Sequence, residues 1–232
     1  MSQDTKQLYL FKGISGKEVH VNFNGGNISS DSGVIMLHEF MDEIGVIKKV
    51  AKLLPDDRHQ SYIDHTTEQL LSQRVLQIIA GYKDSNDCNA LRHDPALKTA
   101  CGKKPESDGP LASQPTMFRF EHRIDPKTLV RLGRLQVDLF IRSYKKAPET
   151  VILDFDDTED QTYGSQQLSM FNAYYGSVCY QPMHVYEGKS GKLVATILRP
   201  GKRPTGKEIA KMIRRIVRLI KKAWPEVNII IR

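Results

Sequence analysis

The chain has 232 residues, of which 40% are hydrophobic, so it can bury a core and is not a disordered protein. No apolar run approaches the ~20 residues that span a bilayer, the N-terminus has no signal-peptide pattern, and the three cysteines form no CxxC pair; we therefore expect a cytoplasmic protein with no membrane partner. The formal net charge is +7, which favours a DNA or RNA partner and an ordinary basic surface about equally.

Residues 1–148 predict a mainly helical region that opens with a small β-hairpin. Strand-like alternation covers residues 17–23, after a Gly-Ser turn, and a polar loop follows. Apolar spacing predicts helices over 32–54, broken at Gly45, and over 66–82, which starts with a capping-box pattern. Residues 102–116 predict a loop, and residues 125–148 predict a helix capped by an Asp-Pro pair. We expect this region to bind DNA.

Residues 149–232 predict a strand-rich second domain. Residues 151–155 form an apolar strand, and the segments 177–188 and 192–200 flank a turn and predict a hairpin. An amphipathic helix over 205–222 begins with a capping box, and "VNIIIR" predicts a buried strand of a parallel sheet. The order strand, strand, strand, helix, strand opens an RNase H-like fold, so the predicted class is α/β (α+β) with the first half of such a domain.

The stretch "VILDFDDTED" places acidic side chains at the end of the first of these strands. Because side chains alternate along a strand, Asp154 and Asp156 point to one face, and Asp157 and Glu159 point to the other. Two neighbouring carboxylates repel each other, and Mg²⁺ removes that conflict by accepting hard oxygen ligands. The alternative is a strand that runs into a solvated acidic turn. We favour a metal site made by Asp154 and Asp156.

Basic side chains gather in the loop "RPGKRPTGK", just past a predicted strand. The candidate phosphate contacts are Arg199, Lys202, Arg203 and Lys207. For the basic face of the helix that follows, a solvated surface is an equal alternative. The histidines elsewhere have no recognised metal-ligand spacing, so we expect them to cap helices, bond loops or pack.

Several motifs together carry a family resemblance. The segment "LDFDDTEDQTYGSQQLSMFNAYYGSVCYQPMHVY" resembles the opening of the catalytic domain of DDE transposases, with the insertion-sequence group numbered thirteen-eighty as the best match. The upstream segments "SSDSGVIMLHEF", "EQLLSQRVLQIIAGYKDSNDCNALRHDPALKTACGK" and "PLASQPTMFRFEH" look like the same group. The resemblance covers nearly the whole chain, with the motifs in the family's order.

The resemblance implies a magnesium-dependent enzyme on an RNase H-like fold. In the family, three carboxylates bind two Mg²⁺ ions, and the enzyme cleaves DNA at transposon ends and joins the 3′ hydroxyl to target DNA. The segment Asp156-Asp157-Thr158 matches the family's D-x-T, which makes Asp156 the first catalytic carboxylate and Asp154 its alternative or helper. Asp157 and Glu159 depart mildly from the family pattern. The implied partners are the transposon terminal repeats and target DNA, and homo-oligomerisation stays open.

The second and third family carboxylates have no counterpart in this sequence. The second would follow the strand "VNIIIR", where the chain ends at Arg232. We therefore expect a truncated N-terminal portion that binds Mg²⁺ weakly and is inactive alone. The alternative is a non-catalytic DNA-binding transposase remnant, or an inhibitor that competes with the complete enzyme. An unrelated RNase H-like nuclease is a third reading, disfavoured by the N-terminal motifs.

Overall fold

The computed structural model describes residues 9–14, 17–21 and 31–232. It divides the chain into two compact units, residues 1–128 and 129–232. Most of the predicted polar loop that follows residue 21 lies outside the described residues. Both units contain helices and strands, which confirms a mixed α+β protein. No helix among the described residues has the length and apolar character needed to cross a membrane.

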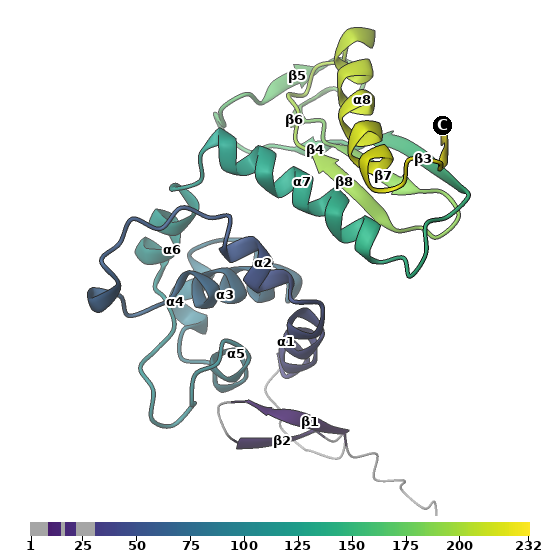
Figure 1. The fold of residues 1–232 in the computed structure, drawn as a ribbon. Coiled ribbons are helices and arrows are strands. Elements are labelled where there is room, and N and C mark those ends of the chain that lie inside the picture. Colours follow the sequence, from purple (N-terminus) through teal and green to yellow (C-terminus); the bar gives the residue numbers. More distant parts are fainter. Residues whose placement is uncertain (1–8, 15–16, 22–30) are drawn as a thin grey trace, which may run out of the picture. The chain divides into compact units, whose positions relative to one another are not determined.

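The first unit is mainly helical, and its described residues include a hairpin (Figure 1). Its elements are β1 Tyr9–Ile14, β2 Lys17–Val21, α1 Gly33–Ile44, α2 Val46–Ala51, η1 Gln60–Tyr62, α3 Thr67–Ile79, α4 Asp87–Leu91, α5 Pro95–Ala100 and α6 Gln114–Glu121. β1 and β2 pair antiparallel. Gly45 separates α1 from α2 in the left-handed conformation at φ 63°, which glycine adopts without steric cost. The capping box that begins α3 is present.

The core of the first unit lies between α1, α3 and α5. Its buried residues are Val34, Met41, Leu76, Ala96, Leu97, Ala100, Cys101 and Leu111. The buried side chain of Gln73 donates to the Ala112 carbonyl and accepts from its amide, both at 2.9 Å. These two bonds fix the long loop that precedes α6, because they satisfy the buried backbone of that loop.

The second unit contains a four-stranded sheet, a small three-stranded sheet and a long helix of its own. Its elements are β3 Thr150–Asp157, β4 Asp160–Gln161, β5 Met170–Asn172, β6 Ser177–Tyr180, β7 Met183–Glu187, β8 Leu193–Ile197, α8 Gly206–Ala223 and β9 Asn228–Ile231. The helix α7 Pro126–Arg142 contributes Val137 and Phe140 to the core of this unit. In this division the second unit begins at residue 129, within α7, whereas the predicted domain boundary falls between residues 148 and 149.

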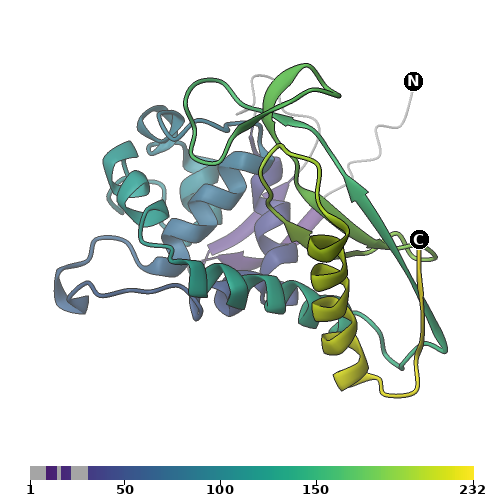
Figure 2. The same ribbon diagram turned by 90° about the horizontal axis from the view of Figure 1, so that it is seen from above.

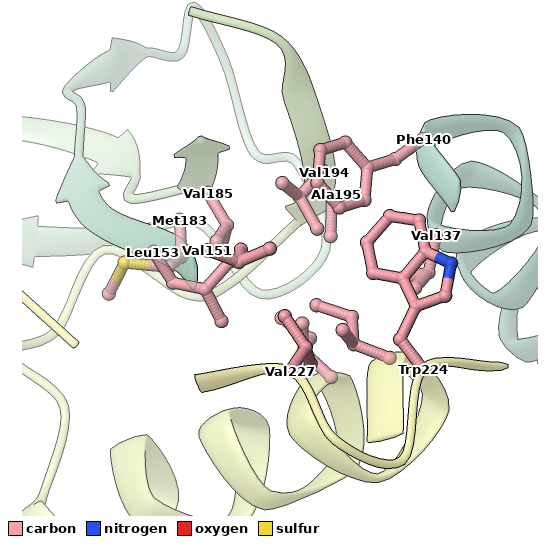
Figure 3. Packing of buried hydrophobic residues seen from close by; sticks show 12 residues of the cluster. Val137, Phe140, Val151, Leu153, Met183, Val185, Val194, Ala195, Trp224 and Val227 are labelled. Carbon is pink, nitrogen blue, oxygen red and sulfur yellow. The ribbon is translucent and has the colours of Figure 1, made fainter. Parts of the chain in front are cut away.

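The larger sheet has the strand order β8-β7-β3-β9. β3 pairs antiparallel with β7 and parallel with β9, and the last strand is seen beside β3 in Figure 2. One face is covered by α7 and α8, since Phe140, Ile216 and Trp224 share a core with the strand residues Val151 and Val185 (Figure 3). The opposite face of β3 receives no residue from this core. The predicted hairpin corresponds to β7 and β8.

Two predictions about strands were wrong. The segment 177–188 is not one strand, because it breaks at Gln181 and Pro182, and β6 joins β4 and β5 in the smaller sheet. Proline has no amide hydrogen for a sheet ladder, which explains the break. β9 is not buried: it pairs only with β3 among the described strands, and Ile230 and Ile231 are 52% and 47% exposed.

Candidate metal and DNA site

Asp154 and Asp156 lie on the face of β3 that points away from the core. Val151 and Leu153 are fully buried in the core, and Phe155 packs against it. The alternation along the strand then places both aspartates on the opposite face, as the sequence predicted. Across the strand pair, the register sets Asp156 opposite His184 and Asp154 opposite Tyr186 of β7.

The carboxylate of Asp154 is held by a guanidinium. Arg232 Nε donates to Asp154 Oδ1 at 2.8 Å, and Arg232 Nη2 donates to Oδ2 at 2.7 Å. The Arg232 amide also donates to the Leu153 carbonyl at 2.9 Å, which continues the ladder between β9 and β3. The bond to Asp154 raises the pKa of Arg232. Asp154 is therefore already paired with a cation.

The turn after β7 leaves room for this pair. A Cβ atom at Gly188 would lie 2.8 Å from Asp154 Oδ2, which is closer than side-chain atoms normally approach. Glycine at this position lets the carboxylate lie over the turn beside Arg232. Gly188 is thus part of what positions Asp154.

Asp156 is the more available carboxylate. It is exposed, and no hydrogen bond or ion pair to its side chain is found among the described residues. Its neighbour His184 directs Nδ1 toward Thr196 Oγ1, at 3.2 Å. Asp156 can therefore accept a ligand without breaking a contact within the fold.

The other acidic residues of the stretch hold the small sheet in place. Asp157 Oδ2 accepts from the buried Gln181 Nε2 at 2.6 Å. Glu159 accepts a hydrogen bond from the Ser177 hydroxyl. Asp160 is exposed in β4. The structure thus separates structural acids, which bind β6 and its neighbours, from the two that face away from the core.

The donor set is suited to Mg²⁺ only in part. Carboxylate oxygens are the ligands that Mg²⁺ prefers, with water completing its shell. The carboxylate of Asp156 is open, whereas that of Asp154 must first leave Arg232. Among the described residues, no group of three or more His, Cys, Asp or Glu side chains could hold a metal ion.

The basic loop after β8 is exposed except at its first candidate residue. Lys202, Arg203 and Lys207 are exposed. Arg199 is only 8% exposed, and its guanidinium donates to the carbonyls of Gln181 and Lys202, both at 3.2 Å. The Arg199 side chain therefore lies inside the fold and cross-links the loop, and its direct contact with DNA stays a prediction.

Arg232 is the site residue that sequence reasoning missed. Its partner Asp154 lies 78 positions away in the chain. The available signal was a basic residue directly after an apolar strand that was predicted to run parallel to an earlier one. Parallel neighbours bring their carboxyl ends to the same edge of the sheet, where Asp154 also lies.

Comparison with known protein families defines the class. The sequence model of the family described as "Transposase DDE domain group 1" matches residues 11–232. The match places the chain among transposases with a DDE domain. Within that class, it belongs to the transposase DDE domain group 1 family. Searches of curated proteins and of solved structures gave no match.

Proposed function

We propose that this transposase domain acts in DNA transposition by Mg²⁺-dependent cleavage and strand transfer at transposon ends. The observation that carries the proposal is the exposed carboxylate of Asp156, on the non-core face of the central strand β3. The sheet order β8-β7-β3-β9, with β9 parallel to β3, supports an RNase H-like catalytic domain. The motifs shared with insertion-sequence group thirteen-eighty support membership of that group within the DDE transposases.

Asp156 would be the principal metal ligand in this proposal, and Asp154 would assist it. A bound Mg²⁺ ion supplies an activated water or hydroxyl and stabilises the leaving oxygen of a phosphodiester. Asp156 provides an open carboxylate for that ion, and Gly188 provides the space in which the Asp154 carboxylate lies. Arg232 keeps Asp154 neutralised when no metal is bound.

The exposed basic loop would hold the DNA. Lys202, Arg203 and Lys207 carry positive charge on one loop and the first turn of α8. Contacts to phosphates position the DNA without reading its sequence. Arg199 acts indirectly, by holding the Lys202 carbonyl and so fixing the shape of the loop. A cytoplasmic location is part of the proposal, supported by the free thiols of all three cysteines.

A second candidate function is DNA binding without catalysis. The observation that favours it is the bidentate pair between Arg232 and Asp154, which leaves a single open carboxylate on the non-core face of β3. Such a protein would occupy transposon ends and compete with an active transposase.

One experiment separates the two candidates. The protein is incubated with linear DNA that carries the terminal repeats of its element, and binding and strand cleavage are measured with and without Mg²⁺. Mg²⁺-dependent nicks that Asp156→Asn abolishes, and that Asp160→Asn, an exposed carboxylate nearby, leaves unchanged, support the first candidate and contradict the expectation that the chain is inactive alone. Binding without cleavage supports the second candidate. Absence of both binding and cleavage contradicts both.

A further inference from the structure

The first unit contains a cavity of about 670 Å³ whose wall is rich in arginine. Three segments form it: the residues around η1, the end of α4 and the helix α6 with its flanks. The lining includes four arginines, Arg58, Arg92, Arg119 and Arg123, and a single carboxylate, Asp64. The cavity therefore attracts an anion, and none of its residues belongs to the site on β3.

Two of these arginines are held rigidly at the wall. Asp56 binds Arg58 Nε at 2.7 Å and Arg123 Nη1 at 3.1 Å. Arg58 also donates to the His65 carbonyl, at 2.9 Å. The hydrogen bond from Arg58 holds the pKa of Asp56 well below its usual range, so this anchor stays ionised. A wall that is already ordered loses little side-chain entropy when a ligand binds.

The other two arginines retain hydrogen-bonding capacity. The Nε atom of Arg92 is buried and has no partner in the described part of the chain. Arg119 is exposed, and within the described part of the chain its side chain makes one hydrogen bond, from Nη2 to Thr116 Oγ1 at 3.3 Å. A buried donor without a partner is costly unless a ligand satisfies it. Guanidinium groups suit phosphate oxygens because their planar donors bind two at once.

Flat side chains lie next to these cations. Phe118 is 48% exposed, and the ring of His122 stacks on it with a centroid distance of 3.8 Å and an interplanar angle of 29°. A hydrogen-bonding distance of 2.8 Å between His122 Nδ1 and the Phe118 carbonyl fixes this platform. Tyr62, 86% exposed, also lines the cavity. Aromatic faces beside a cationic groove are the features that bind unpaired nucleotides.

We propose that this cavity binds one unpaired nucleotide of a DNA strand, with the phosphate at Arg92 and Arg119 and the base on the platform of Phe118 and His122. The volume suits a ligand of nucleotide size. A base within a duplex is stacked on both faces and offers no free face to Phe118, whereas an unpaired base does. This inference rests on the proposed function in that it takes DNA as the partner.

The test measures binding of a short fluorescent single-stranded oligonucleotide by anisotropy, without Mg²⁺. Phe118→Ala is expected to weaken binding about tenfold through lost stacking, and Phe118→Tyr is expected to retain it because the ring remains. The matched control is Phe40→Ala, which removes a 59% exposed aromatic from α1, outside the cavity. Since Phe118 is half exposed, the variants should fold, and circular dichroism checks that they do.

The charge is tested in the same assay. Arg119→Gln is expected to weaken binding and to reduce the slope of log affinity against log salt by about 0.7, as for one lost phosphate contact to a single strand. Lys52→Gln, which removes an exposed charge at the end of α2, is the matched control and should have no effect.

The outcomes distinguish this inference from the proposed function. If Phe118→Ala and Arg119→Gln bind the single strand like the unmodified protein, the cavity is not a nucleotide site, although DNA binding at the basic loop can still hold. If Phe118→Ala weakens duplex binding as much as single-strand binding, the unpaired base is contradicted. If the unmodified protein binds no DNA, both proposals fail.

Discussion

The guanidinium of Arg232 and the carboxylate of Asp154 form a two-point ion pair, with N–O distances of 2.8 and 2.7 Å. The pair joins the end of β9 to the middle of β3. Its consequence is an asymmetry between two aspartates on one face: Asp154 is already neutralised, and Asp156 is open. A metal ion that binds here can use the Asp156 carboxylate directly, but it must compete with Arg232 for the Asp154 carboxylate.

Removal of the Arg232 charge should therefore strengthen metal binding. For Arg232→Gln, we expect the affinity for Mn²⁺, used as a probe for Mg²⁺, to rise about thirtyfold, as for one unit charge removed ~4 Å from a divalent ion in water. The affinity is measured by electron paramagnetic resonance, which reports the concentration of free Mn²⁺. The matched control is Arg218→Gln, an exposed arginine of α8. Unchanged affinity in Arg232→Gln would show that Asp154 takes no part in metal binding.

Asp157 should matter for stability, and its neighbour Asp156 should not. Asp157→Ala leaves the buried Gln181 Nε2 without its partner, so we expect the free energy of unfolding to fall by about 1–3 kcal/mol. Asp156→Ala removes an exposed carboxylate with no contact among the described residues and should leave that free energy unchanged. Urea unfolding compares the two variants. Equal losses of stability would contradict the separation of structural and site acids.

Local patterns in the sequence predicted much of this arrangement. Alternation placed Asp154 and Asp156 on one face, and the capping-box pattern placed the start of α8 at Thr205. Local patterns did not predict which side chains are buried or which residues far apart in the sequence form pairs. The sequence does not show that Arg199 turns inward to the Gln181 carbonyl, because exposed and inward-facing arginines at a strand end have the same local pattern.

The cavity of the first unit was missed for the same reason. Arg58 and Arg123 meet at Asp56 although 65 positions separate them, and Arg92 reaches the same wall from α4. Each of these segments has an ordinary local explanation as a loop or a helix end. Only their tertiary arrangement brings the cations together.

The basic loop offers a test that separates DNA contact from loop structure. Arg203→Gln should leave stability unchanged and reduce the salt slope of duplex binding by about 0.9, because Arg203 is exposed. Arg199→Gln should cost about 1–3 kcal/mol in the free energy of unfolding, because two backbone carbonyls lose a donor. Salt titration of binding and urea unfolding measure the two effects. Lys189→Gln, exposed in another turn, is the control for charge.

Glu187 should make the second unit sensitive to acid. Burial disfavours its charge, but hydrogen bonds from the Ser190 hydroxyl and amide outweigh that effect and lower its pKa to about 2. A lowered pKa contributes stability that is present above the unfolded-state pKa of about 4.5 and is lost as the pH falls toward 2. Glu187→Gln should therefore cost about 3 kcal/mol at pH 7 and much less near pH 2.

Denaturant unfolding at several pH values measures this difference for Glu187. Glu226→Gln, which changes an exposed carboxylate, is the matched control and should show no such pH dependence. A stability difference between the unmodified protein and Glu187→Gln that stays constant from pH 7 to pH 3 would contradict the assignment.

The packing of the basic loop on the small sheet depends on a glycine. A Cβ atom at Gly201 would lie 2.3 Å from the Cys179 carbonyl oxygen and 2.6 Å from that of Met170. Gly201→Ala must therefore push the loop away from β5 and β6 and break the 2.6 Å bond from Asn172 Nδ2 to the Gly201 carbonyl. We expect a loss of about 3 kcal/mol in the free energy of unfolding, together with weaker DNA binding, because Lys202 and Arg203 move with the loop.

The control is Gly206→Ala at the start of α8, where no atom lies within 4 Å of the added carbon and the helix favours alanine. Urea unfolding and anisotropy with duplex DNA measure both effects, and normal stability and binding in Gly201→Ala would show that the loop does not depend on this close approach.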